Sequence, residues 1–370
     1  MFTDTEALRY QLQRKSRLKH TQGTMERTAS RITRLKALPI TRIAIVRALQ
    51  LGDLLCAVPA WRALRAVFPS ARISLIGLPW ARLFVSRFHH YLDEFIEFPG
   101  YPGLPERAVA IESIPPFLME MQSRRFDLVL QMHGSGHYVN ELAALFGARE
   151  TAGFYVQGDW CPDPDSFAPY PDTLPEVHRH LNLMAFLGVA SLGNDVEWPV
   201  TPADEDAFMS LDESRLLMQR EYVCIHPGGR GVSRRWAPEH FGGIADAIAE
   251  RGFQIVITGT PEESDLANAM VSAMKTKALS MVGRTDLGTL GVLLRHAKIL
   301  VANDTGVSHM AAALRLPSVI ICTGSDPIRW GPLNRQRHRV LLGQDASLDS
   351  VIREIDDLLA VVSMDAQVPV

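Results

Sequence analysis

The sequence predicts an α/β protein made of two Rossmann-like domains, each with a parallel sheet. Short apolar segments typical of buried strands recur in both halves of the chain. A polar loop containing glycine and then an amphipathic helix follow most of them. Strand–helix–strand units with right-handed crossovers give parallel sheets, and 370 residues suffice for two domains of ordinary size.

Composition and charge exclude several classes of protein. The net charge is −3, from 38 basic and 41 acidic residues, which argues against a general nucleic-acid-binding protein. The sequence contains no apolar run of transmembrane length and no apolar N-terminal segment typical of a secretory signal. The four cysteines form no CxxC pair, so no structural zinc is expected. We therefore expect a cytoplasmic protein.

Residues 1–40 form a basic N-terminal extension. They contain nine Lys or Arg and three Asp or Glu, a local charge of +6 on a chain that is acidic as a whole. A solvated helix or partly ordered arm is the simpler interpretation. The alternative hypothesis is peripheral contact with anionic lipid, which would place the protein at the inner face of the inner membrane.

The first domain is predicted over residues 41–190. Its first strand is followed by a loop that ends at Gly52 and Asp53 and that lacks the G-x-G-x-x-G fingerprint of dinucleotide-binding proteins. Taken alone, Asp53 is best interpreted as a helix cap, although ligands bind at this edge of open α/β sheets. Expected strands are 42–46, 72–77, 94–98 and 126–130, and expected helices are 54–68 and 176–187.

A second polar loop in this domain, 131–137, follows the strand at 126–130. His133 and Ser135 in this loop, and Asn140 just after it, are candidate substrate contacts because they follow a strand at the same sheet edge as Asp53. Residues 157–175 lack periodicity and are expected to form an irregular surface loop, and residues 191–206 are the predicted linker between the domains.

The second domain is predicted over residues 207–345, followed by a C-terminal helical segment, 346–370. Its strand–loop units place Gly, Thr, His or Arg at successive strand ends, as in a nucleotide site. Expected strands are 222–225, 254–257, 278–282, 299–302 and 318–322, and expected helices are 238–251, 287–296, 310–314 and 348–361.

The junction of Asp304, Thr305, Gly306 and His309 is the centre of the predicted site. Gly306 lets the backbone approach a ligand, and the N–H groups at the start of the next helix favour an anion. A phosphate group would be held there by Thr305, His309 and main-chain N–H groups. The alternative is that Asp304 merely caps the helix.

Further polar residues follow the other strands of this domain. His226 ends one strand, and the guanidinium fork of Arg234 suits a diphosphate. Glu263 lies where a carboxylate would bind ribose hydroxyl groups. The His, Asp and Glu residues show no metal-ligand spacing, so neither a metal nor another cofactor is expected.

Taken in order, these motifs resemble the heptosyltransferase-type glycosyltransferases of family 9, which act in lipopolysaccharide core assembly. The resemblance covers about residues 42–342. It rests on Ile43–Arg47 with Gly52-Asp53, His226-Pro227-Gly228, Arg235-Trp236, Thr258-Gly259 with Glu263, Gly283-Arg284-Thr285, Asn303–Gly306 with His309, and Asp326-Pro327 with Arg329–Pro332. The order and spacing of the whole set make the resemblance specific.

The resemblance implies a GT-B type fold, in which two Rossmann-like domains face each other across a cleft and the last helix crosses back to the first domain. It implies an inverting, metal-independent enzyme that moves a heptose from ADP-heptose to a lipopolysaccharide-core or related glycan acceptor. Asp53 would be the general base. His226, Arg234, Glu263, Asp304, Thr305, Gly306 and His309 would bind the nucleotide sugar, and Arg47, His133 and Ser135 the acceptor.

Other functions remain open at this stage. A member of the same family could use a different nucleotide-sugar donor or a protein or capsule acceptor. A non-catalytic module that binds nucleotide sugars is the alternative from another class, although a module would have no reason to keep Asp53 together with the phosphate-binding residues. An oxidoreductase is disfavoured by the missing G-x-G-x-x-G.

Overall fold

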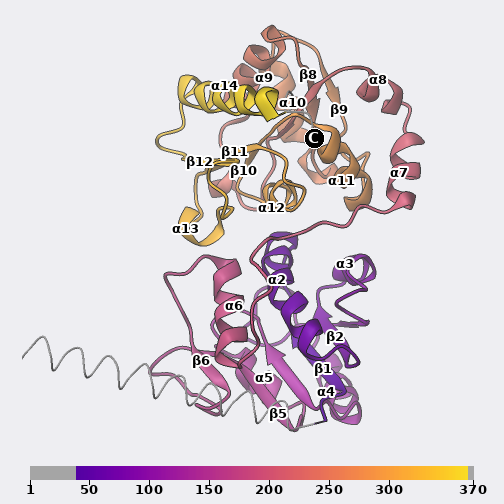
Figure 1. Ribbon diagram of the computed structural model, residues 1–370, viewed down its shortest axis with the longest axis vertical. Helices are drawn as coiled ribbons and strands as arrows, with labels where there is room; N and C mark the ends of the chain where they lie inside the picture. The colour runs from indigo at the N-terminus through magenta and orange to yellow at the C-terminus, as the bar shows by residue number, and fades with distance from the viewer. Residues whose placement is uncertain (1–38, 366–370) are drawn as a thin grey trace, which may run out of the picture. The chain divides into compact units, whose positions relative to one another are not determined.

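The computed structural model describes residues 39–365, and the side chains of 362–365 are not described (Figure 1). Most of the basic extension 1–40 therefore lies outside the described residues. The described chain divides into two compact units. The first unit comprises residues 39–49, 59–172 and 177–194, and the second comprises 50–58, 173–176 and 195–365. The second unit thus includes two short pieces of the predicted first domain, residues 50–58 and 173–176.

The first unit is built on a parallel six-stranded sheet with the order β3-β2-β1-β4-β5-β6. In the register of the central strands, Ile43 pairs with Ile73 on one side and with Leu128 on the other. The strands are β1 (Arg42–Val46), β2 (Arg72–Gly77), β3 (Glu94–Glu97), β4 (Leu128–Gln131), β5 (Glu150–Tyr155) and β6 (Phe167–Pro169).

Both faces of this sheet are covered, as the unbroken apolar sequence of β1 predicts. Ala44 and Val46 pack in one hydrophobic core with Phe117 of α4 and Leu142 of α5, while their neighbour Ile45 is fully buried on the opposite face. The helical segments are α2 (Leu51–Val67), α3 (Ala81–Arg87), η1 (Ile111–Ser113), α4 (Ile114–Ser123), α5 (Val139–Ala144) and α6 (Glu176–Phe186).

The second unit repeats this design, with a parallel sheet of order β12-β11-β10-β7-β8-β9. Its strands are β7 (Tyr222–His226), β8 (Gln254–Ile257), β9 (Ala278–Ser280), β10 (Leu300–Asn303), β11 (Ser318–Cys322) and β12 (His338–Leu342). β10 and β7 are neighbours at the centre of this sheet although 73 residues separate their ends at His226 and Leu300.

One face of the second sheet is covered by α9, α10 and α14, and α14 lies beside α9 (Figure 1). Ile244, Met270 and Ile355 pack with strand residues such as Val301 in one core. The helical segments are α7 (Pro202–Met209), α8 (Ser214–Gln219), η2 (Val232–Arg234), α9 (Pro238–Glu250), η3 (Pro261–Glu263), α10 (Ser264–Ala273), α11 (Leu287–His296), α12 (Gly306–Ala313), α13 (Pro327–Trp330) and α14 (Leu348–Asp365).

Two parallel α/β sheets confirm the predicted fold class, and several local expectations change. The loops expected before residues 54 and 310 are shorter, because α2 begins at Leu51 and α12 at Gly306. β6 lies within 157–175, which was expected to be irregular. α7 begins at Pro202, inside the predicted linker 191–206. The return of the last helix to the first domain stays a prediction.

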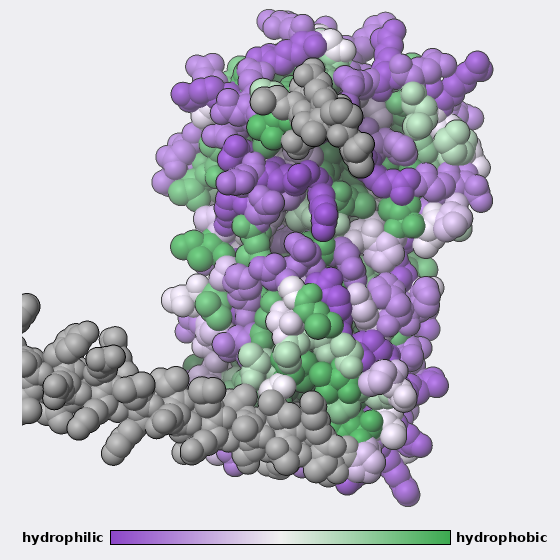
Figure 2. All heavy atoms as spheres, in the orientation of Figure 1, coloured by the Kyte–Doolittle hydropathy of each residue, from purple (hydrophilic) through white to green (hydrophobic). Residues whose placement is uncertain are grey.

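Hydrophilic and hydrophobic residues are interspersed on the face drawn in Figure 2. Among residues 39–365, no helix has both the length and the apolar character needed to span a bilayer.

Candidate active site

The order of strands defines one topological switch point in each sheet. In both sheets the first strand lies between the second and the fourth, which is the 3-2-1-4-5-6 order of nucleotide-binding folds. Loops leave in opposite directions at such a point and open a crevice beyond the carboxyl ends of the strands. In the second unit these strands are β7 and β10, which end at His226 and Asn303.

Asn303 ties the loop after β7 to the end of β10. Its side chain is fully buried, and Nδ2 donates to the main-chain oxygens of Pro227 at 2.8 Å and Gly228 at 3.1 Å. Its Oδ1 accepts from the main-chain N–H of Trp236 at 2.9 Å. Asn303, which directly precedes Asp304, therefore fixes both ends of segment 227–236. Asn303 belongs to one of the motifs quoted above, but its sequence context predicted no role for it.

Glu263 fixes the same segment from the side of β8. Oε1 accepts from the N–H of Gly229 at 2.9 Å, and Oε2 accepts from the N–H of Thr260 at 2.8 Å in a capping box. A Cβ on Gly228 would lie 2.1 Å from Glu263 Oε1, so the glycine is required for this approach. Both carboxylate oxygens of Glu263, the residue predicted to bind ribose, therefore already accept hydrogen bonds from the protein. Ribose binding by Glu263 stays a prediction.

His226 is buried beside Glu263 rather than exposed at the strand end. Its Nδ1 lies 3.1 Å from Thr258 Oγ1, and its Nε2 lies 3.6 Å from Glu263 Oε2. Burial lowers the pKa of His226, and the Glu263 carboxylate opposes that shift. His226 is therefore neutral near pH 7 and contributes no full positive charge to the predicted nucleotide site.

Arg234 is presented at the surface by the short helix η2. The hydroxyl of Thr323, which follows β11, donates to the main-chain oxygen of Ser233 at 2.9 Å. A Cβ on Gly324 would lie 2.7 Å from that same oxygen, so this glycine permits the close approach. η2 is thus held against the loop after β11, and Arg234 is left exposed to solvent.

The residues after Asn303 form the first turn of α12. Thr305 is the N-cap residue and Gly306 the first helical residue, so His309 lies in the helix and not in a loop. The Ser308 hydroxyl donates to the main-chain oxygen of Thr305 at 2.6 Å. The Ser308 N–H donates to the same oxygen at 3.0 Å, and the N–H groups that precede it at the helix start lie at the crevice edge of the sheet.

The start of α2 meets α12 within the second unit. A Cβ on Gly52 would lie 2.6 Å from Cδ2 of His309, so the imidazole rests directly on the glycine backbone. Sγ of Cys56 lies 3.6 Å from Nδ1 of the same ring. Asp53 is in the first turn of α2, where its Oδ2 accepts from the N–H of Gln50 at 3.2 Å. The candidate base therefore also caps its helix.

Burial and nearby carboxylates control the charge of His309. Burial lowers the pKa of His309 below its ordinary value, while the carboxylates of Asp304, Asp53 and Glu176 oppose the shift. In the protein without ligand, His309 is therefore a neutral hydrogen-bonding group near pH 7. Oδ1 of Asp304 is buried and accepts no hydrogen bond from the described residues, which is costly for a carboxylate oxygen.

An ion pair with one buried partner, which sequence reasoning missed, lies in the same unit. Nε of Arg329 donates to Oε2 of Glu176 at 3.0 Å, and the Glu176 side chain is 4% exposed. The Arg329 guanidinium lies 4.5 Å from the ring centroid of Trp330, and that ring meets His309 edge-on at 6.5 Å. Arg329 and Trp330 belong to a motif quoted above, whereas no pattern in the sequence pointed to Glu176.

The candidate acceptor residues lie at the switch point of the first sheet, after β1 and β4. Arg47 is fully buried and donates to the main-chain oxygen of Met132. His133 accepts at Nδ1 from the N–H of Ala48 at 3.1 Å and is 5% exposed. Both side chains bind neighbouring backbone, while Ser135 is half-buried in the following loop. Acceptor binding by these residues stays a prediction.

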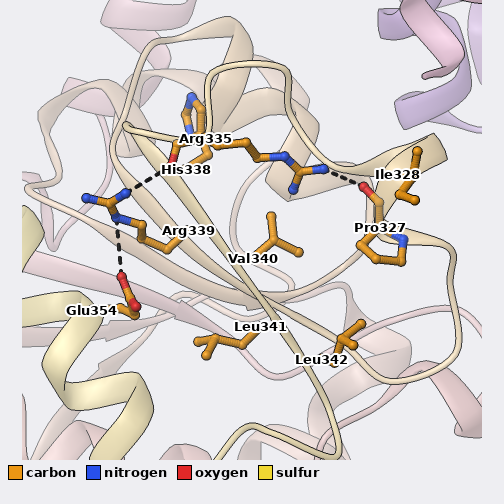
Figure 3. Close-up of a pocket in the computed structure, with 9 residues that line it drawn as sticks. All are labelled: Pro327, Ile328, Arg335, His338, Arg339, Val340, Leu341, Leu342 and Glu354. Atoms are coloured by element: carbon orange, nitrogen blue, oxygen red, sulfur yellow. Dashed lines mark hydrogen bonds and ion pairs between the residues drawn. The ribbon is translucent and has the colours of Figure 1, made fainter. Parts of the chain in front are cut away.

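None of the predicted site residues lines the pocket shown in Figure 3. This pocket, of about 430 Å³, lies in the second unit beside the edge strand β12, where Arg339 pairs with Glu354 at 3.3 Å. Among residues 39–365, no group of three or more His, Cys, Asp or Glu side chains is arranged to hold a metal ion.

Comparison with known proteins identifies the family. Residues 118–358, more than half of the chain, match the model of glycosyltransferase family 9 (heptosyltransferase). The chain belongs to glycosyltransferase family 9. This membership confirms the resemblance seen in the sequence and makes the protein a glycosyltransferase.

Relatives of this family 9 chain match most of its length. It is 25% identical over 293 residues to lipopolysaccharide heptosyltransferase 3 of Escherichia coli K12, covering 76% of this chain and 82% of that protein. It is 23% identical over 313 residues to lipopolysaccharide heptosyltransferase 2 of the same organism, covering 81% and 88%.

Solved structures of family 9 share the fold. A family 9 glycosyltransferase from Veillonella parvula aligns with a TM-score of 0.73 at 21% identity, covering 87% of this chain and 97% of that one. The Escherichia coli ADP-heptose lipopolysaccharide heptosyltransferase II aligns with a TM-score of 0.67 at 21% identity, covering 87% and 99%. The predicted GT-B class is confirmed at the level of the fold.

Proposed function

We propose that this glycosyltransferase transfers a heptose from ADP-heptose to a lipopolysaccharide-core or related glycan acceptor, with inversion and without a metal ion. The names of its relatives support the donor and the acceptor class. The observation that carries the mechanism is the packing of the first turn of α2 against α12. This packing brings the Asp53 carboxylate near enough to His309 to act on its pKa.

The proposed reaction is a single displacement at the anomeric carbon. An acceptor hydroxyl attacks that carbon, the bond from the carbon to the diphosphate oxygen breaks, and ADP leaves with the bonding electrons. The hydroxyl proton passes to the Asp53 carboxylate, because a neutral hydroxyl is a poor nucleophile. Attack from the side opposite to the leaving group inverts the anomeric configuration.

The leaving diphosphate needs positive groups and dipoles in the place of a metal ion. The N–H groups at the start of α12 and the Thr305 hydroxyl would bind its oxygens, and the exposed guanidinium of Arg234 would add charge. His309 would donate a hydrogen bond as a neutral imidazole, in keeping with its lowered pKa. Oδ1 of Asp304, which has no hydrogen-bond partner within residues 39–365, would accept a hydrogen bond from a hydroxyl group of the donor.

Calorimetric titration with ADP, UDP, GDP and CDP, with and without magnesium, tests the donor. We expect selective binding of ADP that needs no magnesium and that weakens at least tenfold in His309→Ala. Preference for UDP or GDP would replace the donor assignment, and an absolute need for magnesium would overturn the metal-independent mechanism. Failure of every nucleotide to bind would favour a different function for the fold.

Asp53→Asn tests the general base. We expect slow hydrolysis of ADP-heptose to fall about 10²- to 10⁴-fold while the affinity for ADP stays within threefold. Asp265→Asn is the matched control, because Asp265 also lies in the first turn of a helix, α10, and is exposed. Equal hydrolysis by Asp53→Asn and the control would remove Asp53 from the chemistry.

A further inference from the structure

A small pocket in the first unit lies beyond the carboxyl ends of the neighbouring strands β4 and β5. Its volume is about 180 Å³. His137 in the loop before α5 and Asn140 and Glu141 in its first turn line one side. Val156, Asp159 and Trp160, in the segment after β5, line the other. The pocket therefore opens at the same sheet edge as the first switch point, where open α/β sheets bind ligands.

Gly136 and Asn140 hold the two sides of the pocket together. Gly136 has φ +100°, and a Cβ on it would lie 2.2 Å from the main-chain oxygen of Phe154. Asn140 Nδ2 donates to that same oxygen at 3.0 Å. The loop after β4 is thus fastened to the end of β5, and the pocket is a defined part of the fold.

One buried polar group in the pocket has no partner among the described residues. Asn140 is 3% exposed, and its Oδ1 accepts no hydrogen bond there. Native proteins pair nearly all buried polar atoms, so this oxygen, which has almost no accessible surface, is an unsatisfied acceptor beside the pocket. The Nδ2 group of the same amide already donates to the main-chain oxygen of Phe154.

The remaining groups match the surface of a sugar. Trp160 is 54% exposed, which is unusual for such a large apolar side chain and leaves its indole free to cover the C–H groups of a pyranose ring. Glu141 and Asp159 are exposed carboxylates that accept hydrogen bonds from hydroxyl groups, and Asp159 lies 3.4 Å from His137. No lysine or arginine is among the residues that line this pocket.

We propose that this pocket binds an uncharged hexose residue of the acceptor glycan. Its assignment to the acceptor rests on the proposed function, because only a transferase needs a second sugar site away from the donor. The two carboxylates bind hydroxyl groups and repel a sugar acid, whose carboxylate would meet no lysine or arginine here. The pocket therefore selects a neutral sugar against an anionic one.

The full chain is titrated with methyl glucoside, methyl galactoside and methyl glucuronide while the indole N–H signals of ¹⁵N-labelled tryptophan are followed by NMR. Trp160→Phe identifies the Trp160 signal by its loss. We expect a neutral glycoside to shift that signal and to bind at least tenfold more tightly than the glucuronide. Trp160→Ala should lose neutral glycoside binding at least tenfold in saturation-transfer NMR, whereas Met119→Ala, at an exposed residue of α4, should not.

The doubly neutralised variant Glu141→Gln with Asp159→Asn tests the charge selection. It should reduce the preference for the glucoside over the glucuronide by at least fivefold while the protein stays folded by circular dichroism. The proposal is overturned if no glycoside binds, if the glucuronide binds the wild type as well as the glucoside does, or if Trp160→Ala binds normally.

ADP titration of the same samples separates this proposal from the proposed function. Trp160→Ala should bind ADP as the wild type does, because Trp160 belongs to the first unit and the predicted nucleotide residues to the second. Absence of glycoside binding by the wild-type protein, together with normal ADP binding, would overturn only the sugar pocket. Glycoside binding by a protein that binds no nucleotide would overturn the proposed transferase reaction and the assignment of this pocket to an acceptor.

Discussion

At the scale of single residues, Gly52 shows how one missing side chain can determine a site. The His309 ring occupies the space that any Cβ at position 52 would need, with Cδ2 only 2.6 Å away. The ring is buried and sits between Gly52 and Cys56, so it has little freedom to move aside. Gly52 therefore positions His309 next to Asp53 without contributing a functional group.

Gly52→Ala should displace His309 and lower ADP-heptose hydrolysis about tenfold or more, since a contact of 2.6 Å forces atoms to shift. The measurement is the hydrolysis rate together with the thermal midpoint. Gly77→Ala is the control, because its Cβ would meet its nearest neighbour at an ordinary 3.4 Å. Normal hydrolysis in Gly52→Ala would show that the position of His309 does not matter.

His338 couples stability to pH. Burial lowers its pKa from 6.5 to about 4, with Arg337 and Arg335 adding to the shift, and its Nδ1 lies 2.9 Å from Ser318 Oγ. As the pH falls, His338 is therefore protonated near pH 6.5 in the unfolded chain but only near pH 4 in the folded protein. Stability should be unaffected above the unfolded pKa and should fall by about 3 kcal/mol as the pH drops from 6.5 to 4.

Denaturant unfolding of the whole protein at pH values between 7.5 and 4 measures this loss, with the free energy of unfolding of the second unit as the readout. His338→Asn has no imidazole to protonate. The slope of its free energy of unfolding against pH should therefore be smaller in that window, by the amount that uptake of about one proton on unfolding produces. The exposed His89→Asn serves as the comparison. Parallel curves for His338→Asn and the wild type would contradict the assignment.

At the scale of elements, segment 227–236 is a loop that three neighbouring strands hold in place. Asn303 at the end of β10, Glu263 after β8 and Thr323 after β11 each bind its backbone. The sequence pattern suggested that polar residues at strand ends bind ligand directly. The structure shows that Glu263, a predicted ribose-binding residue, and Asn303, which had no predicted role, both hydrogen-bond to the loop that presents Arg234.

Asn303→Asp should loosen that loop. The substitution keeps the shape and the acceptor for Trp236, but it replaces a donor to two carbonyl groups by an oxygen that repels them. Loss of these buried bonds costs about 1–3 kcal/mol, and we expect ADP affinity to fall about tenfold or more. Hydrogen exchange of residues 227–236 and calorimetry measure the two effects, with Thr323→Ser, which keeps its hydroxyl, as the control.

At the scale of the whole molecule, two separate cores allow the units to respond to mutation separately. Ile355 of α14 is 1% exposed and packs in the core of the second sheet. Ile355→Ala should cost the second unit about 2–5 kcal/mol. Hydrogen exchange should show faster opening of β7, β10 and β11, and little change in β1 and β4. Equal acceleration in both sheets would contradict independent cores.

The motifs of the sequence were sufficient to predict the fold class and the family, which the sheets and the family match confirm. Site prediction went less far. Asp304, Thr305, Gly306 and His309 were grouped because they are adjacent in the chain, and Asp53 joined them through the resemblance. The roles proposed for them stay predictions. Glu176 escaped notice because a lone glutamate at a helix start carries no pattern.

The sequence by itself determined the alternation of strands and helices and the order of the glycine-containing loops, because periodicity and turn chemistry are local properties. Only the tertiary structure decided that Gly52 supports a ring 257 positions away and that Glu263 serves the backbone of Gly229. Such meetings depend on strand order and on the path of each loop. Local sequence does not encode these distances, and the packing of the whole sheet sets them.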